Sequence, residues 1–257
     1  MEERVVEVAT ASGTMEAFVT HPREGGPFAA VVVYMDVWGL REELFDVARR
    51  IGTAGYYCVV PDLYYRHGKV RHEFRDENNR MISMERLDEE RKELVRKHMR
   101  ALTDEMVVED TRSLLEVMDT REPVRSGASG AIGYCMGGRH VFRVAGAFPE
   151  RFRACASLHG TRLVTDQKDS PHFSAMKARG ELYCGFAEHD PYAPMSTVNT
   201  LAETLGHAGL QYRHEVHKGK EHGYSLPDRD IYDKSAANRD WELMFAMFHR
   251  QIPVRPQ

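Results

Sequence analysis

The chain has 257 residues, of which 42% are hydrophobic, and its formal net charge is −4. A chain of this length buries a large core without disulfides or structural metals, and it suits one large α/β domain. The mildly acidic balance provides no basic surface for nucleic acid or for an anionic membrane. We therefore expect neither nucleic acid nor a membrane as a partner.

Strand and helix patterns alternate along most of the chain. The first two strand patterns flank Ser12-Gly13 and predict a β-hairpin. Alternating or continuously apolar runs predict strands at residues 4–9, 14–20, 29–35, 56–60, 128–133, 152–158, 181–186 and 211–217. Helical periodicity predicts helices at residues 42–54, 105–119, 138–147, 195–208 and 235–250.

Residues 66–105 break this alternation. Their segments RHEFRDENNR and RLDEERKELVRKHMR are rich in charge and lack a strong apolar stripe. Such a pattern is typical of a solvated helical excursion, and the alternative is a cap beside an active site. Because no repeat, low-complexity tract or linker divides the chain, we expect a single domain over residues 1–257.

Strands that alternate with helices predict an α/β fold with a mainly parallel central sheet and helices on both faces. The opening hairpin would add an antiparallel N-terminal edge. In such a sheet, functional residues gather on the loops that follow the carboxyl ends of the strands. Candidate residues were therefore sought at those loops.

The segment Gly133-Tyr134-Cys135-Met136-Gly137 joins a predicted strand to a predicted helix. This is the nucleophile-elbow pattern of the α/β-hydrolase fold, with Cys in place of Ser. The turn is sharp, so side chains at the flanking glycines would collide with the strand and helix. The helix N-terminus favours a thiolate at Cys135, and a structural cysteine in a glycine-rich turn is the alternative.

Two polar residues follow later strands in the order that a hydrolase triad requires, namely nucleophile, acid and histidine. Asp190 comes after the strand at 181–186, and His222 comes after the strand at 211–217. His222 would accept the thiol proton and later protonate the leaving group, while Asp190 would orient it. His189 is a rival on the same loop as Asp190, and His159 is a candidate pocket residue.

The loop after the strand at 29–35 is expected to supply an oxyanion donor. The backbone N–H groups of Val37 and Met136 form the candidate pair. Asp36 directly follows a very apolar run, so its carboxylate should face either solvent or the site.

The other cysteines, Cys58, Cys155 and Cys184, lie in apolar strand-like runs, which predicts a buried core role. There is no Cys/His zinc spacing, and we expect no metal or organic cofactor. The N-terminal sequence MEERVVEVAT has no apolar signal-peptide region. A reducing cytoplasm is therefore the expected location.

At these residues the chain resembles the dienelactone hydrolase family. The shared pieces lie between about residues 28 and 225 and read DVWGL, PDLYYR, GYCMGG, EHD and EHGY in this sequence. The resemblance implies a Cys135–Asp190–His222 triad and an oxyanion hole at Val37 and Met136. It makes Asp36, Trp38, Arg66, Tyr134 and His159 candidate supporting or substrate-contacting residues.

The chain departs from the family pattern at two places. The family has a glutamate that helps to control thiol protonation where this chain has Asp36, which is shorter by one methylene group. The type enzyme also holds a lactone carboxylate with an arginine shortly after its histidine, whereas here Arg229 lies seven residues after His222. Arg66, Arg80 and Arg86 could supply charge instead, so dienelactone itself is not carried over as the substrate.

The sequence thus predicts a hydrolase that cleaves a small ester or lactone through Cys135 and a thioester acyl-enzyme. A thioesterase or acyltransferase on the same site is one alternative. A non-catalytic protein of this fold that binds a ligand or senses oxidation is another, because thiolates are easily oxidised. The protein is expected to be a monomer or a homodimer.

Overall fold

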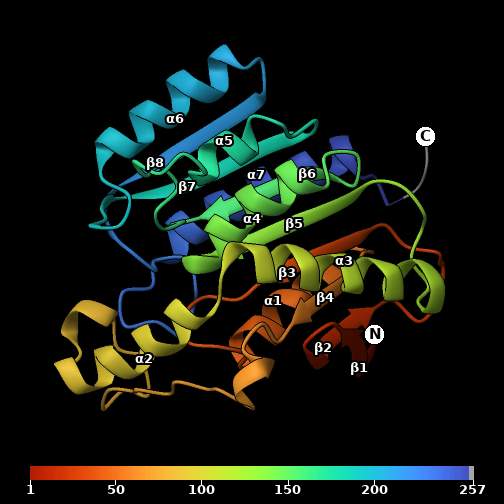
Figure 1. Cartoon of the computed structure of the whole chain (residues 1–257), viewed down its shortest axis with the longest axis horizontal. Helices are drawn as coiled ribbons and strands as arrows, with labels where there is room; N and C mark the ends of the chain where they lie inside the picture. The colour runs from red at the N-terminus through yellow and green to blue at the C-terminus, as the bar shows by residue number, and fades with distance from the viewer. Residues whose placement is uncertain (255–257) are drawn as a thin grey trace.

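The computed structural model describes residues 1–254. Figure 1 shows a central sheet whose strands run in the order β1-β2-β4-β3-β5-β6-β7-β8. The strands are β1 (Glu2–Thr10), β2 (Gly13–His21), β3 (Ala30–Tyr34), β4 (Tyr57–Pro61), β5 (Ser129–Tyr134), β6 (Phe152–Leu158), β7 (Glu181–His189) and β8 (Gln211–Glu221). Each strand that the sequence predicted is present.

The pairing of the strands confirms the mixed sheet. β1 pairs with β2 and β2 with β4 in antiparallel register, whereas the neighbours from β4 to β8 pair in parallel. The hairpin closes between Thr10 and Gly13. β3 and β4 are buried along their whole length, as their continuous apolar sequences predicted, and β5 is buried as well.

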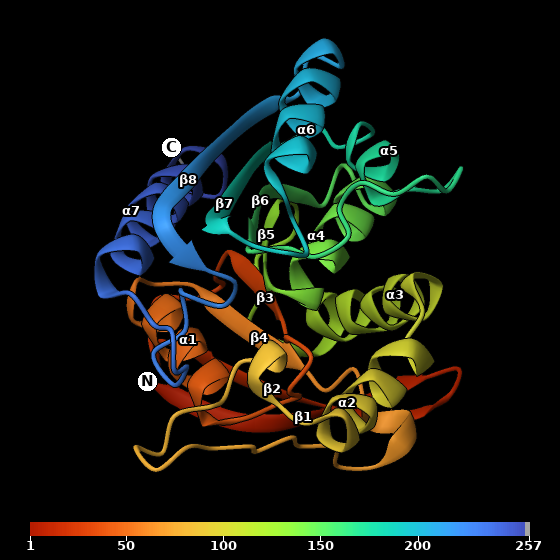
Figure 2. The same cartoon turned by 90° about the vertical axis from the view of Figure 1, so that its left-hand side faces the viewer.

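Helices cover both faces of the sheet. They are α1 (Glu42–Thr53), α2 (Glu89–Ala101), α3 (Asp104–Arg121), α4 (Met136–Ala147), α5 (Pro171–Ala175), α6 (Met195–His207) and α7 (Lys234–Gln251). Figure 2 shows α1 and α7 on one face, and α3, α4, α5 and α6 on the other. The chain therefore has the predicted α/β-hydrolase layering, with loops free to meet at the carboxyl edge of the parallel strands.

The segment at residues 66–105 is less helical than predicted. Its α-helix is α2, while residues 68–83 are irregular and are flanked by short 3-10 helices at Tyr65–His67 and Met84–Arg86. Asp76 explains part of the difference, because its Oδ1 accepts hydrogen bonds from the N–H groups of Asn78 and Arg80 and so favours a turn over a helix. Within residues 1–254, no helix has the length and apolar character needed to cross a bilayer.

Candidate active site at the carboxyl edge of the sheet

Cys135 lies on a sharp turn between β5 and α4. Its backbone has φ 55° and ψ −115°, a strained conformation for a residue with a side chain. The flanking glycines have no room for a Cβ atom. A Cβ at Gly133 would lie 2.0 Å from the carbonyl oxygen of Gly137, and one at Gly137 would lie 2.2 Å from that of Tyr34. The glycine spacing is therefore a packing requirement of this turn.

The turn places Cys135 at the N-terminus of α4, where unpaired N–H groups and the helix dipole favour negative charge. The Cys135 carbonyl accepts hydrogen bonds from the N–H groups of Gly138 and Thr161, at 3.0 and 3.1 Å. These bonds fix the backbone, so the side chain has a defined direction into a cavity.

His222 and Asp190 come together from the loops after β8 and β7. Nδ1 of His222 lies 2.8 Å from Oδ2 of Asp190. The other carboxylate oxygen, Oδ1, accepts from the N–H of Tyr192 at 2.8 Å, which holds the carboxylate in place. Nε2 of His222 is buried and forms no hydrogen bond within residues 1–254. His189, the rival histidine, is exposed beside Glu188.

The surroundings of His222 favour its charged form. Burial alone would lower the pKa of His222, but the charges of Cys135 and Asp190, together with the hydrogen bond to Asp190, outweigh it and raise the pKa to about 10. Cys135 and His222 line the same cavity, so the two side chains face a common space. This arrangement suits a thiolate–imidazolium pair, which is the reactive form of a cysteine nucleophile.

Of the candidate oxyanion donors, Val37 lines the same cavity as Cys135, and Met136 directly follows Cys135 in the chain. Neither the N–H of Val37 nor that of Met136 donates to another group in the described part of the chain. Tyr64 donates its hydroxyl to the carbonyl of Val37 at 3.1 Å, which helps to fix the loop after β3. Two unpaired backbone donors beside a thiol are the elements of an oxyanion hole.

A cavity of about 250 Å³ joins these groups. Its lining residues are Val37, Trp38, Met84, Arg96, Met99, Cys135, Thr161, Arg162, Tyr192, His222 and Arg229. Pockets for drug-sized ligands usually measure roughly 300–1,000 Å³, so this cavity suits a small molecule. Among residues 1–254, no three His, Cys, Asp or Glu side chains form a metal-binding group.

Asp36 faces away from solvent but does not line this cavity. Arg41, at the start of α1, donates to Oδ1 of Asp36 at 2.7 Å and to Oδ2 at 2.9 Å. Oδ1 also accepts from the N–H of Trp38 at 3.0 Å. Both carboxylate oxygens of Asp36 are therefore occupied.

Three other candidates, which the sequence offered as supporting or substrate-contacting residues, do not line the cavity. Arg66 pairs with Asp110 at 2.7 Å, so its charge is neutralised on α3. Tyr134 is buried under the elbow. His159 lies behind His222 with 4.9 Å between ring centroids, and its Nε2 is 2.8 Å from the hydroxyl of Ser225. These two residues pack beneath the site and do not face a ligand.

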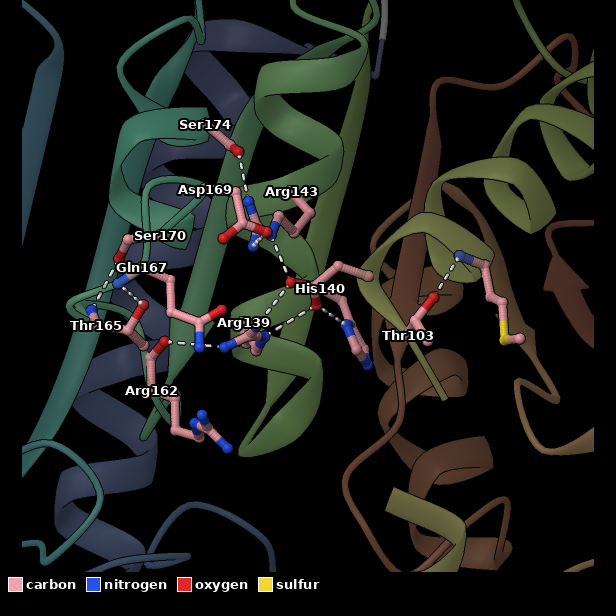
Figure 3. A network of polar contacts seen from close by, with 12 residues as sticks. Thr103, Arg139, His140, Arg143, Arg162, Thr165, Gln167, Asp169, Ser170 and Ser174 are labelled. Atoms are coloured by element: carbon pink, nitrogen blue, oxygen red, sulfur yellow. Dashed lines mark hydrogen bonds and ion pairs between the residues drawn. The ribbon is translucent and has the colours of Figure 1, made fainter. Parts of the chain in front are cut away.

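The other arginines that the sequence offered as charge donors also have partners. Arg86 pairs with Asp230 and Glu221 at 2.7 and 2.8 Å, and Arg80 donates to the carbonyl of Pro227. Arg139 donates to Asp104 at 2.9 Å, in a network that also contains Arg143 (Figure 3). This network ties α4 to the start of α3 and leaves Arg139 without a role in the cavity.

Several cavity residues were not predicted, above all Thr161, Arg162, Tyr192 and Arg229. Arg229 is only 3% exposed, and its guanidinium carbon lies 5.1 Å from the centre of the Trp38 ring. It has no ion pair within residues 1–254. Its separation of seven residues from His222 does not reveal that the intervening loop folds back over Trp38.

A mainly parallel sheet with a cysteine on its strand-to-helix elbow defines the class of this protein, the α/β-hydrolase fold. A family model, "Dienelactone hydrolase family", matches residues 15–252. The chain therefore belongs to the dienelactone hydrolase family and is by class an ester or lactone hydrolase.

Individual relatives agree with this assignment. A protein of Methylorubrum extorquens provisionally named a carboxymethylenebutenolidase is 24% identical over 249 residues, which cover 95% of this chain and 80% of the relative. A protein of the same name from Saccharolobus solfataricus is 25% identical, over 92% of this chain and 94% of the relative. A crystal structure from Klebsiella pneumoniae, provisionally named a dienelactone hydrolase, has a TM-score of 0.82 at 21% identity, covering 97% of this chain and 98% of that one. This last likeness concerns the fold.

Proposed function

We propose that the protein hydrolyses a small carboxylic ester or lactone with Cys135 as nucleophile, His222 as acid and base, and Asp190 as the orienting carboxylate. The observation that carries this proposal is the 2.8 Å contact between His222 and Asp190, which leaves Nε2 of His222 unpaired beside Cys135. In such a triad, one imidazole nitrogen contacts the orienting carboxylate, and the other is free to exchange a proton with the nucleophile.

The reaction follows from these positions. The Cys135 thiolate attacks the carbonyl carbon, and the N–H groups of Val37 and Met136 bind the resulting oxyanion. The C–O bond of the ester then breaks, and the His222 imidazolium protonates the departing alkoxide. In the second half, His222 removes a proton from water and the hydroxide attacks the thioester. The C–S bond then breaks, the carboxylic acid leaves, and the Cys135 thiolate re-forms beside the His222 imidazolium.

Arg229 narrows the substrate class. It lines the cavity with Cys135 and His222, is buried, and has no carboxylate partner within the described residues. Burial lowers its pKa, while the charge of Asp36 acts in the opposite direction. An arginine is charged at any physiological pH, so a substrate that carries a carboxylate near its scissile bond would supply the missing partner. We therefore propose an anionic acyl group or lactone of modest size.

Burst kinetics test the nucleophile. The native protein is mixed with p-nitrophenyl valerate and with p-nitrophenyl hydrogen glutarate, which differ by a methyl group in place of a carboxylate. We expect a burst of nitrophenolate equal to the enzyme concentration, and a larger kcat/KM for the glutarate ester. Cys135→Ala should abolish the burst, whereas the matched control Cys155→Ala, in the core strand β6, should retain it. Turnover that survives Cys135→Ala would overturn the assignment.

A further inference from the structure

Two buried arginines close to the cavity have opposite surroundings. Arg41 is 5% exposed and contacts two carboxylates, with 2.7 Å to Asp36 and 2.6 Å to Asp228. Arg229 is 3% exposed and pairs with neither. Because Asp228 directly precedes Arg229 and Asp36 directly precedes Val37, Arg41 links the loop of the free arginine to the loop of the oxyanion donor.

The electrostatics follow this geometry. Burial acts to lower the pKa of Arg41, but the charges of Asp36 and Asp228 outweigh it and raise the pKa overall. For Arg229 burial dominates and lowers the pKa, and Asp36 is the strongest charge acting on it. Asp36 therefore attracts Arg229 but forms no ion pair with it. The Asp36 carboxylate is instead held by three donors, two from Arg41 and one from the N–H of Trp38.

The same bonds bear on proton transfer. In the family pattern, an acidic residue at the position of Asp36 helps to control thiol protonation. Here Asp36 is 0% exposed, Arg41 binds both of its carboxylate oxygens, and Asp36 does not line the cavity that contains Cys135. His222 is then left as the proton acceptor for Cys135, and Asp36 has a positioning task.

We propose that Arg41 is a positioning residue that determines specificity, because it occupies Asp36 and Asp228 and so keeps Arg229 unpaired for a carboxylate of the substrate. The four side chains together sum to zero formal charge, two arginines against two aspartates. A buried cation without a bonded counter-ion destabilises the protein. An unpaired Arg229 therefore suits a site where the ligand supplies the anion. This inference rests on the anionic substrate class of the proposed function.

The first test compares the two matched p-nitrophenyl esters. Arg41→Gln frees Asp36 to pair with Arg229, so the ratio of kcat/KM for the glutarate ester over the valerate ester should fall by about tenfold or more. The double variant Asp36→Asn/Arg41→Gln restores the net charge and removes the competing carboxylate, and it should recover most of the ratio. Arg49→Gln, on the exposed side of α1, is the control and should leave the ratio unchanged.

A purely structural role for Arg41 gives a different result. In that case Arg41→Gln would lower kcat/KM for both esters alike, and neutralising Asp36 would rescue nothing; either finding overturns the proposal. If Arg41→Gln does not fold, Arg41→Lys decides, because an ammonium cannot hold two carboxylates in the geometry of a guanidinium. An unchanged ester ratio in Arg41→Lys would then overturn it.

A binding measurement separates this inference from the proposed reaction. Glutarate is titrated calorimetrically into Cys135→Ala, alone and combined with Arg41→Gln. We expect the Kd to rise by about tenfold with Arg41→Gln and to recover when Asp36→Asn is added. Because no turnover is needed, this outcome would support the role of Arg41 even if Cys135 proved not to be the nucleophile. An equal Kd in all three proteins would overturn the proposal.

Discussion

The cavity has two walls of different construction. Cys135, Val37 and His222 come from the carboxyl edge of the sheet and are only 6%, 6% and 7% exposed. Arg96 and Met99 come from α2, whose one buried residue is Val95. The sheet-edge wall is fixed by strand pairing and by glycines that admit no side chain. The α2 wall rests on the surface of the protein.

The two walls also differ in the interactions that stabilise them. The α2 helix packs on the core through few apolar side chains, namely Val95 and Met99. Its ion pairs Lys92–Glu89 and Arg96–Glu89, each at 3.1 Å, lie within the helix. Exposed pairs of this kind contribute roughly 0–1 kcal/mol. The chemistry should therefore depend on the sheet edge, whereas α2 should adjust the size and access of the cavity. Substitutions in the two walls should therefore differ in whether they change kcat or KM.

The largest effect is expected at the nucleophile and its base. Cys135→Ala and His222→Ala should each lower kcat by roughly 10⁴–10⁶-fold, since such groups act as one unit. For the same reason the double variant should be little worse than either single variant. Single-turnover kinetics measure both, and fully additive losses would show that the two side chains do not cooperate.

Asp190 should have the next largest effect. Asp190→Asn keeps the size of the side chain but removes the charge that orients His222, so kcat should fall by about 10³–10⁴-fold. Steady-state kinetics at saturating ester provide the measurement. The control is Glu188→Gln, two residues earlier and exposed, which should change kcat little.

The pH dependence tests the charge on His222. Its imidazolium persists below a pKa of about 10 and is lost above it. Hydrolysis of an alkyl ester, whose alkoxide needs a proton, should therefore decline above about pH 10, while release of p-nitrophenolate should not. In Asp190→Asn the alkaline decline should move to lower pH, because a group that raises the pKa is gone. Coincident profiles for the two leaving groups would contradict His222 as the acid.

The smallest effect is expected on α2. Met99→Ala should enlarge the cavity and raise KM by a few-fold, with kcat nearly unchanged, because Met99 contacts the ligand space but not the reacting groups. Arg96→Gln should behave similarly. A loss of kcat as large as that of Asp190→Asn, in either variant, would show that α2 contributes to the chemical step.

The sequence predicted the sheet edge better than the rest of the site. Strands such as β3 and β4 are continuous apolar runs, and the elbow around Cys135 requires glycines at fixed spacing, so local pattern and tertiary position coincide. Asp190 and His222 could be placed because each directly follows a strand. Strand ends in a parallel sheet meet at one edge, which turns sequence order into proximity.

The arginines could not be placed in this way. Arg41 contacts Asp228 across 187 positions of sequence, and no periodic pattern encodes that pairing. Arg66 matched the family pattern but is neutralised by Asp110 of α3, and no sequence pattern links these two residues. The charge pattern at 68–83 predicted helix, but Asp76 forms a turn there that the charge pattern does not reveal.

Covalent catalysis by Cys135 is best tested by detecting the acyl-enzyme. The native protein is mixed with p-nitrophenyl valerate, quenched in acid within the burst and measured by intact mass spectrometry, followed by peptide mapping. We expect the mass of one added acyl group, located on the peptide that contains Cys135 and absent from Cys135→Ala. Continuous turnover with no added mass, or an acyl group on another residue, would contradict covalent catalysis by Cys135.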